Sequence, residues 1–228
     1  MILKQLFDFD TYTYTYLLAS GVGREGVIID PVKGHEHMYE KLINELGLKL
    51  VAAIDTHVHA DHITALGTLR ERLACQSIMG EQSRADCVSI KIKEDETINF
   101  DGLKLKAIYT PGHTDDSYSF VLDGFVFTGD TLLIRGTGRT DFQNGDAYAQ
   151  YDSIKNKLLK LDDHLIVYPG HDYNGHTSSS IYEEKRFNPR LQVNSAHEYA
   201  DLMANLNLPN PKYMDIAVPA NLRCGLDK

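Results

Sequence analysis

The run His57-Val58-His59-Ala60-Asp61-His62 places three histidines and one aspartate within six residues. It follows closely on the apolar residues 50–54, which are typical of a buried strand. Imidazole and carboxylate groups are common ligands of zinc, iron and manganese, and four such groups cannot all be buried without partners. The run therefore indicates a metal site at the end of a strand.

Three further polar residues occur in short motifs that also follow predicted strands. His113 lies in Thr-Pro-Gly-His-Thr, Asp130 in Thr-Gly-Asp-Thr, and His171 in Tyr-Pro-Gly-His-Asp. Because a rigid sheet can aim short loops at one point, we expect these residues to meet the first run. The histidines outside the motifs are expected to be ordinary structural or surface residues: His35, His37, His164, His176 and His197.

The remaining pattern predicts one α/β domain over residues 1–228, without a long linker or a low-complexity segment. Two Asp-Gly pairs lie between apolar runs and predict hairpins over residues 98–105 and 120–127. Other strands are expected within residues 3–18 and at 27–29, 50–54 and 165–168. Helices are expected at about 35–46, 64–73, 148–161, 178–187 and 195–206.

Composition excludes several classes of protein. A hydrophobic share of 43% with 24% charged residues argues against disorder, and a net charge of −9 argues against general nucleic-acid binding. No apolar run approaches the length of a membrane span, and the first residues resemble neither a signal nor a transit peptide. The chain has an odd number of cysteines, and they lie far apart in sequence: Cys75, Cys87 and Cys224. We therefore expect no disulfide framework and a reducing, cytoplasmic location.

Taken in order, the four histidine and aspartate motifs resemble the metallo-β-lactamase superfamily. The resemblance implies an αββα sandwich, in which two mixed β-sheets are flanked by helices and the metal lies at one edge. Within the superfamily, the chain is similar to the persulfide dioxygenase (sulfur dioxygenase, ethylmalonic-encephalopathy protein) family from about residue 3 to residue 225. The most similar segments are residues 132–143, 168–173, 183–191 and 218–225.

This resemblance implies that the protein oxidises glutathione persulfide with O₂ to sulfite and glutathione. It also implies one non-haem Fe(II) per chain, bound by His57, His113 and Asp130, and a homodimer. Two histidines and one carboxylate form a facial triad, which leaves about three coordination positions for water, O₂ and the substrate sulfur.

Four residues leave two alternatives open: His59, Asp61, His62 and His171. In the persulfide dioxygenases they are expected to orient the ligands and tune the iron. In di-metal thioester hydrolases of the glyoxalase II type, the matching residues complete two metal sites. Such hydrolases typically carry a longer helical C-terminal domain, whereas the tail of this chain resembles the dioxygenases. A third hypothesis is a non-catalytic scaffold that has lost its metal, and the intact ligand set argues against it.

Glutathione carries two carboxylates, which arginine side chains recognise through paired hydrogen bonds. Arg139 and Arg190 lie in the family-like segments, and Tyr173 offers a hydroxyl donor. We expect these three residues to bind substrate, the alternative being a surface or fold-stabilising role. Cys224 is expected to be either a thiol near the site or a small buried apolar residue.

Overall fold

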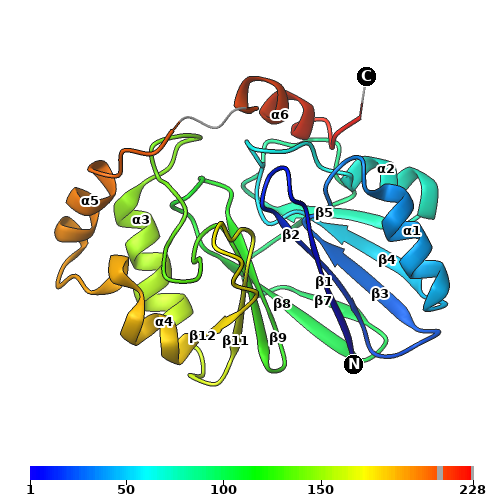
Figure 1. Ribbon diagram of the computed structural model, residues 1–228. Helices are drawn as coiled ribbons and strands as arrows, with labels where there is room; N and C mark the ends of the chain where they lie inside the picture. The colour runs from blue at the N-terminus through cyan, green and yellow to red at the C-terminus, as the bar shows by residue number, and fades with distance from the viewer. Residues whose placement is uncertain (210–212, 227–228) are drawn as a thin grey trace. The chain divides into compact units, whose positions relative to one another are not determined.

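The computed structural model describes residues 1–209 and 213–226, and Figure 1 shows its two β-sheets and their helices. Contacts within the chain group into two units. The first contains Met1–Ile92, Thr97–Leu105 and the C-terminal segment that carries α6 (Met214–Asn221), and the second contains Lys93–Glu96 and the stretch from Lys106 through α5 (Ala196–Ala204). That these units form the single domain predicted from the sequence stays a prediction.

The first sheet has the strand order β1-β2-β3-β4-β5-β6. Its strands are β1 (Ile2–Phe7), β2 (Tyr14–Ala19), β3 (Glu25–Ile29), β4 (Lys49–Ile54), β5 (Gln76–Gly80) and β6 (Ile90–Ile92). The sheet is mixed, because β1 to β3 are antiparallel neighbours and β3 to β6 are parallel neighbours. Since parallel strands end at the same edge, Asp30 after β3 and His57 beyond β4 lie at one edge of this sheet.

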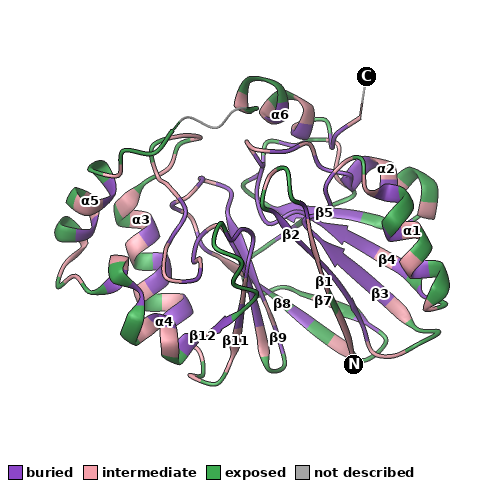
Figure 2. Cartoon of the chain, viewed as in Figure 1, coloured by how far each residue is buried: buried purple, intermediate pink, exposed green. Residues whose placement is uncertain are grey.

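Two helices cover the first sheet, α1 (Glu36–Glu45) and α2 (Leu66–Leu73). Tyr39 of α1 and Leu69 of α2 are buried in one apolar cluster with Ile28 of β3 and Ala53 of β4. Figure 2 shows the central strands of this sheet as largely buried. Burial of this apolar area is the main force that holds the sheet and its helices together.

The alternating run of threonine and tyrosine at residues 11–16 is only partly a strand. β2 begins at Tyr14, and all six of its residues are buried. Before it, Tyr12 adopts a left-handed conformation with φ of 64°, and the Thr11 amide donates to the Asp8 carboxylate at 2.9 Å. The chain therefore turns between β1 and β2, because Asp8 offers the backbone a local hydrogen-bond acceptor.

The second sheet has the order β12-β11-β10-β9-β8-β7. Its strands are β7 (Thr97–Phe100), β8 (Leu103–Tyr109), β9 (Tyr118–Leu122), β10 (Phe125–Gly129), β11 (Ile166–Pro169) and β12 (Ser179–Ser180). This sheet is also mixed, since β10 and β11 are parallel and the pairs β8–β9 and β9–β10 are antiparallel. β8, β10 and β11 thus point the same way, and His113, Asp130 and His171 follow their ends.

The helices of the second unit are α3 (Ala147–Asp152), α4 (Ile181–Phe187) and α5. The predicted helix at 148–161 is helical but not uniform, because a π-helical segment (Ser153–Lys157) and a 3₁₀ turn (Leu158–Lys160) follow α3. Apolar spacing shows that a segment is helical, but not where its hydrogen-bond register changes. Ile154 and Leu158 still bury against Val126 and Val167 of the sheet.

The remaining predicted elements are confirmed within a few residues, and five others were missed: β5, β6, β12, the 3₁₀ turn at Pro189–Leu191 and α6. β6 and β12 are too short to carry a period. α6 contains Pro219, a residue that usually argues against a helix interior. No helix among the described residues is long and apolar enough to cross a lipid bilayer.

The expectation that the chain has no disulfide framework is wrong for one pair of cysteines. Cys87 and Cys224 form a disulfide, and Cys75 is a buried thiol. The bond joins residues 137 positions apart, so spacing in the sequence gave no sign of it. Cys224 is therefore neither a thiol near the site nor an unlinked apolar residue, and the cysteine count does not support a reducing compartment.

Candidate metal centre

Three buried histidines lie together in the loop after β4. The ring centroids of His57 and His59 are 4.2 Å apart, and those of His59 and His62 are also 4.2 Å apart. His59, Asp61 and His62 each offer one possible metal-ligand atom. These three atoms lie within 4.8 Å of one another. The first unit therefore gathers a set of metal-binding groups without any contribution from the second.

Asp30 supports this loop through buried hydrogen bonds, although the sequence analysis did not predict it as a site residue. It is buried, and its carboxylate accepts from the Thr56 amide at 2.7 Å, the Thr56 hydroxyl at 3.0 Å and His59 Nε2 at 3.1 Å. Burial favours neutral His59, but the Asp30 carboxylate outweighs burial and raises the pKa of His59 to about 9. Like the motif residues, Asp30 follows an apolar strand, and that was the signal available.

The hydrogen bonds also indicate which imidazole nitrogens a metal ion could use. His59 donates from Nε2, and its buried Nδ1 has no hydrogen-bond partner among the described residues. The Thr56 hydroxyl donates to Asp30 and lies 2.9 Å from His57 Nδ1. It therefore accepts from that nitrogen and leaves His57 Nε2 unprotonated. Because the raised pKa of His59 keeps a proton on its Nδ1 near neutral pH, a metal ion would have to displace that proton to bind there.

In the second unit, Asp130 lies between two histidines. His171 Nδ1 donates to Asp130 Oδ1 at 2.7 Å, and Asp130 Oδ2 lies 3.6 Å from His113 Nε2. His113 donates from Nδ1 to the Arg139 carbonyl at 2.7 Å, which makes Nε2 the unprotonated nitrogen. His113 Nε2 and Asp130 Oδ2 thus form a pair of ligand atoms suited to one metal, and His171 holds the carboxylate in place.

Two glycines allow this close approach. A Cβ at Gly138 would lie 2.2 Å from the Asp130 carbonyl oxygen and 2.7 Å from His113 Nδ1. A Cβ at Gly170 would lie 2.6 Å from Asp130 Oδ1. Both positions therefore exclude any side chain, because the atoms that it would meet belong to the backbone or to the site itself.

The three predicted substrate residues all lie in the second unit. Tyr173 is exposed, and its ring is nearly parallel to that of His171, with centroids 6.1 Å apart. Arg139 pairs through two nitrogens with the Asp141 carboxylate, at 2.6 and 2.8 Å. Arg190 is half-buried, donates to the carbonyl of Thr137, and makes no ion pair with a described residue. Burial lowers the pKa of the Arg190 guanidinium.

A family model for the metallo-beta-lactamase superfamily matches residues 9–86 and 88–171. The mitochondrial persulfide dioxygenase ETHE1 of Mus musculus is 48% identical over 99% of this chain and 89% of that protein. The crystal structure of ETHE1 from Myxococcus xanthus matches with a TM-score of 0.97 and 49% identity, over 99% of this chain and 100% of that one. The hydroxyacylglutathione hydrolase GloC of Haemophilus influenzae is 31% identical over 75% of this chain and 90% of that protein.

These matches confirm the predicted fold class, with two mixed sheets flanked by helices, and a fold that binds metal through histidine and aspartate. They also separate the two families that the motifs alone could not, since similarity to the hydrolase is lower and covers less of the chain. The chain therefore belongs to the persulfide dioxygenase family of the metallo-β-lactamase superfamily.

Proposed function

We propose that this protein is a glutathione-dependent persulfide dioxygenase, which oxidises glutathione persulfide with O₂ to sulfite and glutathione. One observation carries the proposal: the persulfide dioxygenase ETHE1 of Mus musculus is similar to the chain over 99% of its length, at 48% identity. The histidine and aspartate groups of both units support it, because an oxygenase of this class needs a metal with open coordination positions.

We propose that one Fe(II) per chain is bound by His57 of the first unit and by His113 and Asp130 of the second. Such an ion would supply the one-electron chemistry with O₂ that zinc, which has no redox chemistry, does not offer. His57 donates from Nδ1 to the Thr56 hydroxyl, and His113 donates from Nδ1 to the Arg139 carbonyl. In each neutral ring, Nε2 would then be the nitrogen that binds the metal. His171 keeps the Asp130 carboxylate oriented by donating to its other oxygen.

Within the first unit, we propose that His59, Asp61 and His62 support the iron ligands. Asp30 fixes the ring of His59 through a buried hydrogen bond, and Asp61 accepts from His62 Nδ1 at 3.0 Å. These contacts would hold the loop that carries His57 in one conformation. Preorganised ligands bind a metal more tightly because no ordering cost remains.

For the substrate, we propose that Arg190 binds a glutathione carboxylate, with Tyr173 and Arg139 beside it. Arg190 has only carbonyl and hydroxyl partners among the described residues, at Thr137, so its charge is available to an anion. Arg139 already holds Asp141, and a substrate carboxylate would have to share it. If Arg190 binds remote from the reacting sulfur, Arg190→Ala should raise KM roughly 10- to 100-fold with iron content unchanged.

The runner-up is a di-metal glutathione thioester hydrolase. The proximity of His59, Asp61 and His62 favours it, because these groups could form a second metal site. A relative named hydroxyacylglutathione hydrolase also matches, although over only 75% of the chain. The same three residues serve equally as supports for a mononuclear site, so similarity over the full length decides for the dioxygenase.

An oxygen electrode tests the proposed function. Adding glutathione persulfide to the iron-loaded protein should cause O₂ uptake and produce sulfite. Glutathione, which lacks the second sulfur, is the matched control and should cause no uptake. Rapid hydrolysis of S-lactoylglutathione without any O₂ uptake would reject the dioxygenase and support the hydrolase.

Two further expectations complete the proposal. We propose a homodimer, which light scattering at micromolar concentration would test through its mass of twice 25.6 kDa. We also propose a cytoplasmic location, which cell fractionation would test. The mammalian relatives are named as mitochondrial proteins.

A further inference from the structure

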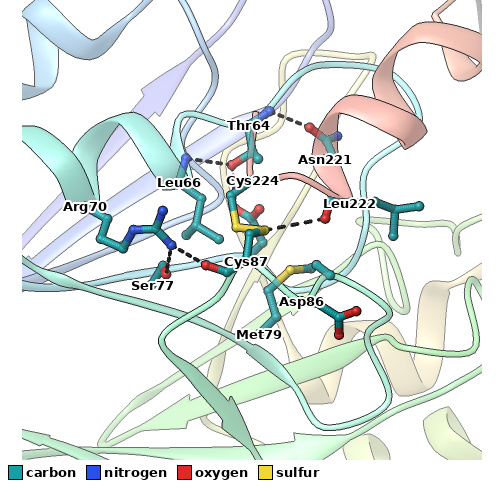
Figure 3. The surroundings of a disulfide bond; sticks show 12 residues. Thr64, Leu66, Arg70, Ser77, Met79, Asp86, Cys87, Asn221, Leu222 and Cys224 are labelled. Carbon is teal, nitrogen blue, oxygen red and sulfur yellow. Dashed lines mark hydrogen bonds between the residues drawn. A yellow bond between two sulfur atoms is a disulfide. The ribbon is translucent and has the colours of Figure 1, made fainter. Parts of the chain in front are cut away.

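The C-terminal segment of the first unit returns to the loop that carries the candidate metal ligands. Asn221, the last residue of α6, is 2% exposed. Its Nδ2 donates to the carbonyl oxygens of His59, at 2.9 Å, and of His62, at 2.8 Å. Its Oδ1 accepts from the Thr64 amide at 2.9 Å (Figure 3). One side chain thus uses both donors and its acceptor on a single loop.

These contacts constrain the backbone of residues 57–64, which we call the metal loop, from outside the loop itself. The carbonyls of His59 and His62 are buried, so without Asn221 they would need another donor or remain unsatisfied. A side chain that joins two carbonyls and one amide also fixes the path of the chain from His59 to Thr64. The directions of the imidazole rings follow from that path.

The backbone beyond Asn221 is attached as well. The Gly67 amide donates to the Cys224 carbonyl at 2.9 Å, and Lys33 Nζ donates to the Gly225 carbonyl at 2.7 Å. A Cβ at Gly225 would lie 2.0 Å from the Thr64 carbonyl oxygen. The segment is therefore seated directly against the metal loop and α2.

The Cys87–Cys224 disulfide is the one covalent cross-link between this segment and the rest of the first unit among the described residues. Cys87 lies between β5 and β6, and Arg70 of α2 donates to its carbonyl and, at 3.3 Å, to the Ser77 hydroxyl (Figure 3). Cys224 is fully buried, whereas Cys87 is half-buried. The disulfide thus joins the Asn221 segment to a point that the sheet and α2 hold in place.

We propose that Asn221 is a positioning residue for the metal loop and that the Cys87–Cys224 disulfide fastens it there, so that metal retention depends on the redox state of this pair. The inference rests on the proposed metal site, but not on the identity of the metal or on the reaction. It assigns roles to two features that the metal ligands themselves do not explain.

The redox step needs only a small thiol. Two glutathione molecules would reduce the bond, giving the thiols of Cys87 and Cys224 and one glutathione disulfide, with two electrons and two protons transferred. Attack is expected at the sulfur of half-buried Cys87, with the Cys224 sulfur leaving. Glutathione is also the product of the proposed reaction, so the protein would meet this reductant during turnover.

The first test compares Asn221→Ala with Val218→Ala, a variant of the same helix whose side chain packs on the apolar core. Both should melt at a lower temperature. Only Asn221→Ala should alter the visible spectrum of the cobalt-substituted protein and speed metal release to a chelator, by roughly 10- to 100-fold. Asn221→Asp keeps the acceptor but loses both donors, and should not restore slow release. A wild-type spectrum and release rate in Asn221→Ala would overturn the positioning role.

The second test places the wild type in glutathione buffers of graded redox potential, with thiols counted by mass spectrometry after alkylation. Metal release should accelerate as Cys87 and Cys224 become reduced. Cys87→Ser should release metal at the fast rate in every buffer. Equal release rates from the oxidised and reduced protein, or two free thiols in every buffer, would overturn the redox role. Because these readouts do not use O₂ uptake, failure of the proposed reaction would be seen separately.

Discussion

The two regions that carry the metal-binding groups are built in different ways. In the first unit, the groups are neighbours in sequence, and distant residues hold them from outside through Asp30 and Asn221. In the second unit, His113, Asp130 and His171 come from the ends of three strands and contact one another directly. One region is local in sequence and needs external support, and the other is dispersed and supports itself.

This difference predicts how each region fails. A loop held by outside contacts should lose stability when a supporting residue is removed, even where that residue binds no metal. A site made by close packing of strand ends should fail when its atoms are forced apart. Single substitutions in each region should separate these two behaviours.

The largest effect should come from the proposed iron ligands. His113→Ala or His57→Ala should remove nearly all iron and lower kcat by 1,000-fold or more, on the order of the loss expected when a metal-dependent step fails. His171→Ala, which leaves the ligands but frees the Asp130 carboxylate, should cost roughly 10- to 100-fold. Iron content and O₂ uptake measure both. Equal losses in all three variants would show that His171 is itself a ligand.

Removal of Asp30 should be the most damaging change to the stability of the first region. Asp30→Ala leaves His59 and the Thr56 amide buried without their partner, at a cost of about 3–5 kcal/mol in the free energy of unfolding. Urea unfolding of the metal-free protein measures it. Asp10→Ala, at an exposed carboxylate of the same unit, is the control and should change the free energy by less than about 0.5 kcal/mol. A similar result for both variants would remove Asp30 from this role.

In the second region, the matched pair is Gly138→Ala and Gly136→Ala. The new Cβ at residue 138 would overlap Asp130 and His113, whereas at residue 136 its nearest contact is 3.9 Å away. Gly138→Ala should therefore cost about 1–3 kcal/mol and lower iron content, and Gly136→Ala should do neither. Thermal melting and metal analysis distinguish them. Full iron content in Gly138→Ala would show that this region tolerates displacement.

The smallest effect should be on the free energy of unfolding at acidic pH. Burial raises the pKa of Asp8, but hydrogen bonds from His35 and Thr11 outweigh it, so the folded-state pKa lies below the ordinary 3.8. Asp8 therefore stabilises the fold above pH 3.8, and this contribution is lost as pH falls through the lower folded value. Asp8→Asn should flatten the loss of unfolding free energy below pH 4 in urea titrations. An unchanged slope would show that other carboxylates govern acid unfolding.

The local region was the more predictable of the two. The His57–His62 run was recognisable because its residues are adjacent, whereas Asp130 and His171 lie in separate motifs and were expected to converge only because each follows a predicted strand. Parallel pairing of β10 and β11 is what brings their ends together, and strand order cannot be calculated from local propensity. Asp30, Asn221 and the Cys87–Cys224 bond were missed for the same reason, since each acts through a contact between residues far apart in sequence.

The most direct measurement is metal content per chain after purification without air. We expect close to one iron and little zinc, because we propose that His57, His113 and Asp130 bind a single Fe(II) as a facial triad. His59, Asp61 and His62 would then carry no metal. Two tightly bound metal ions per chain would contradict a mononuclear site, since the first region would then be a metal site in its own right, as in the thioester hydrolases.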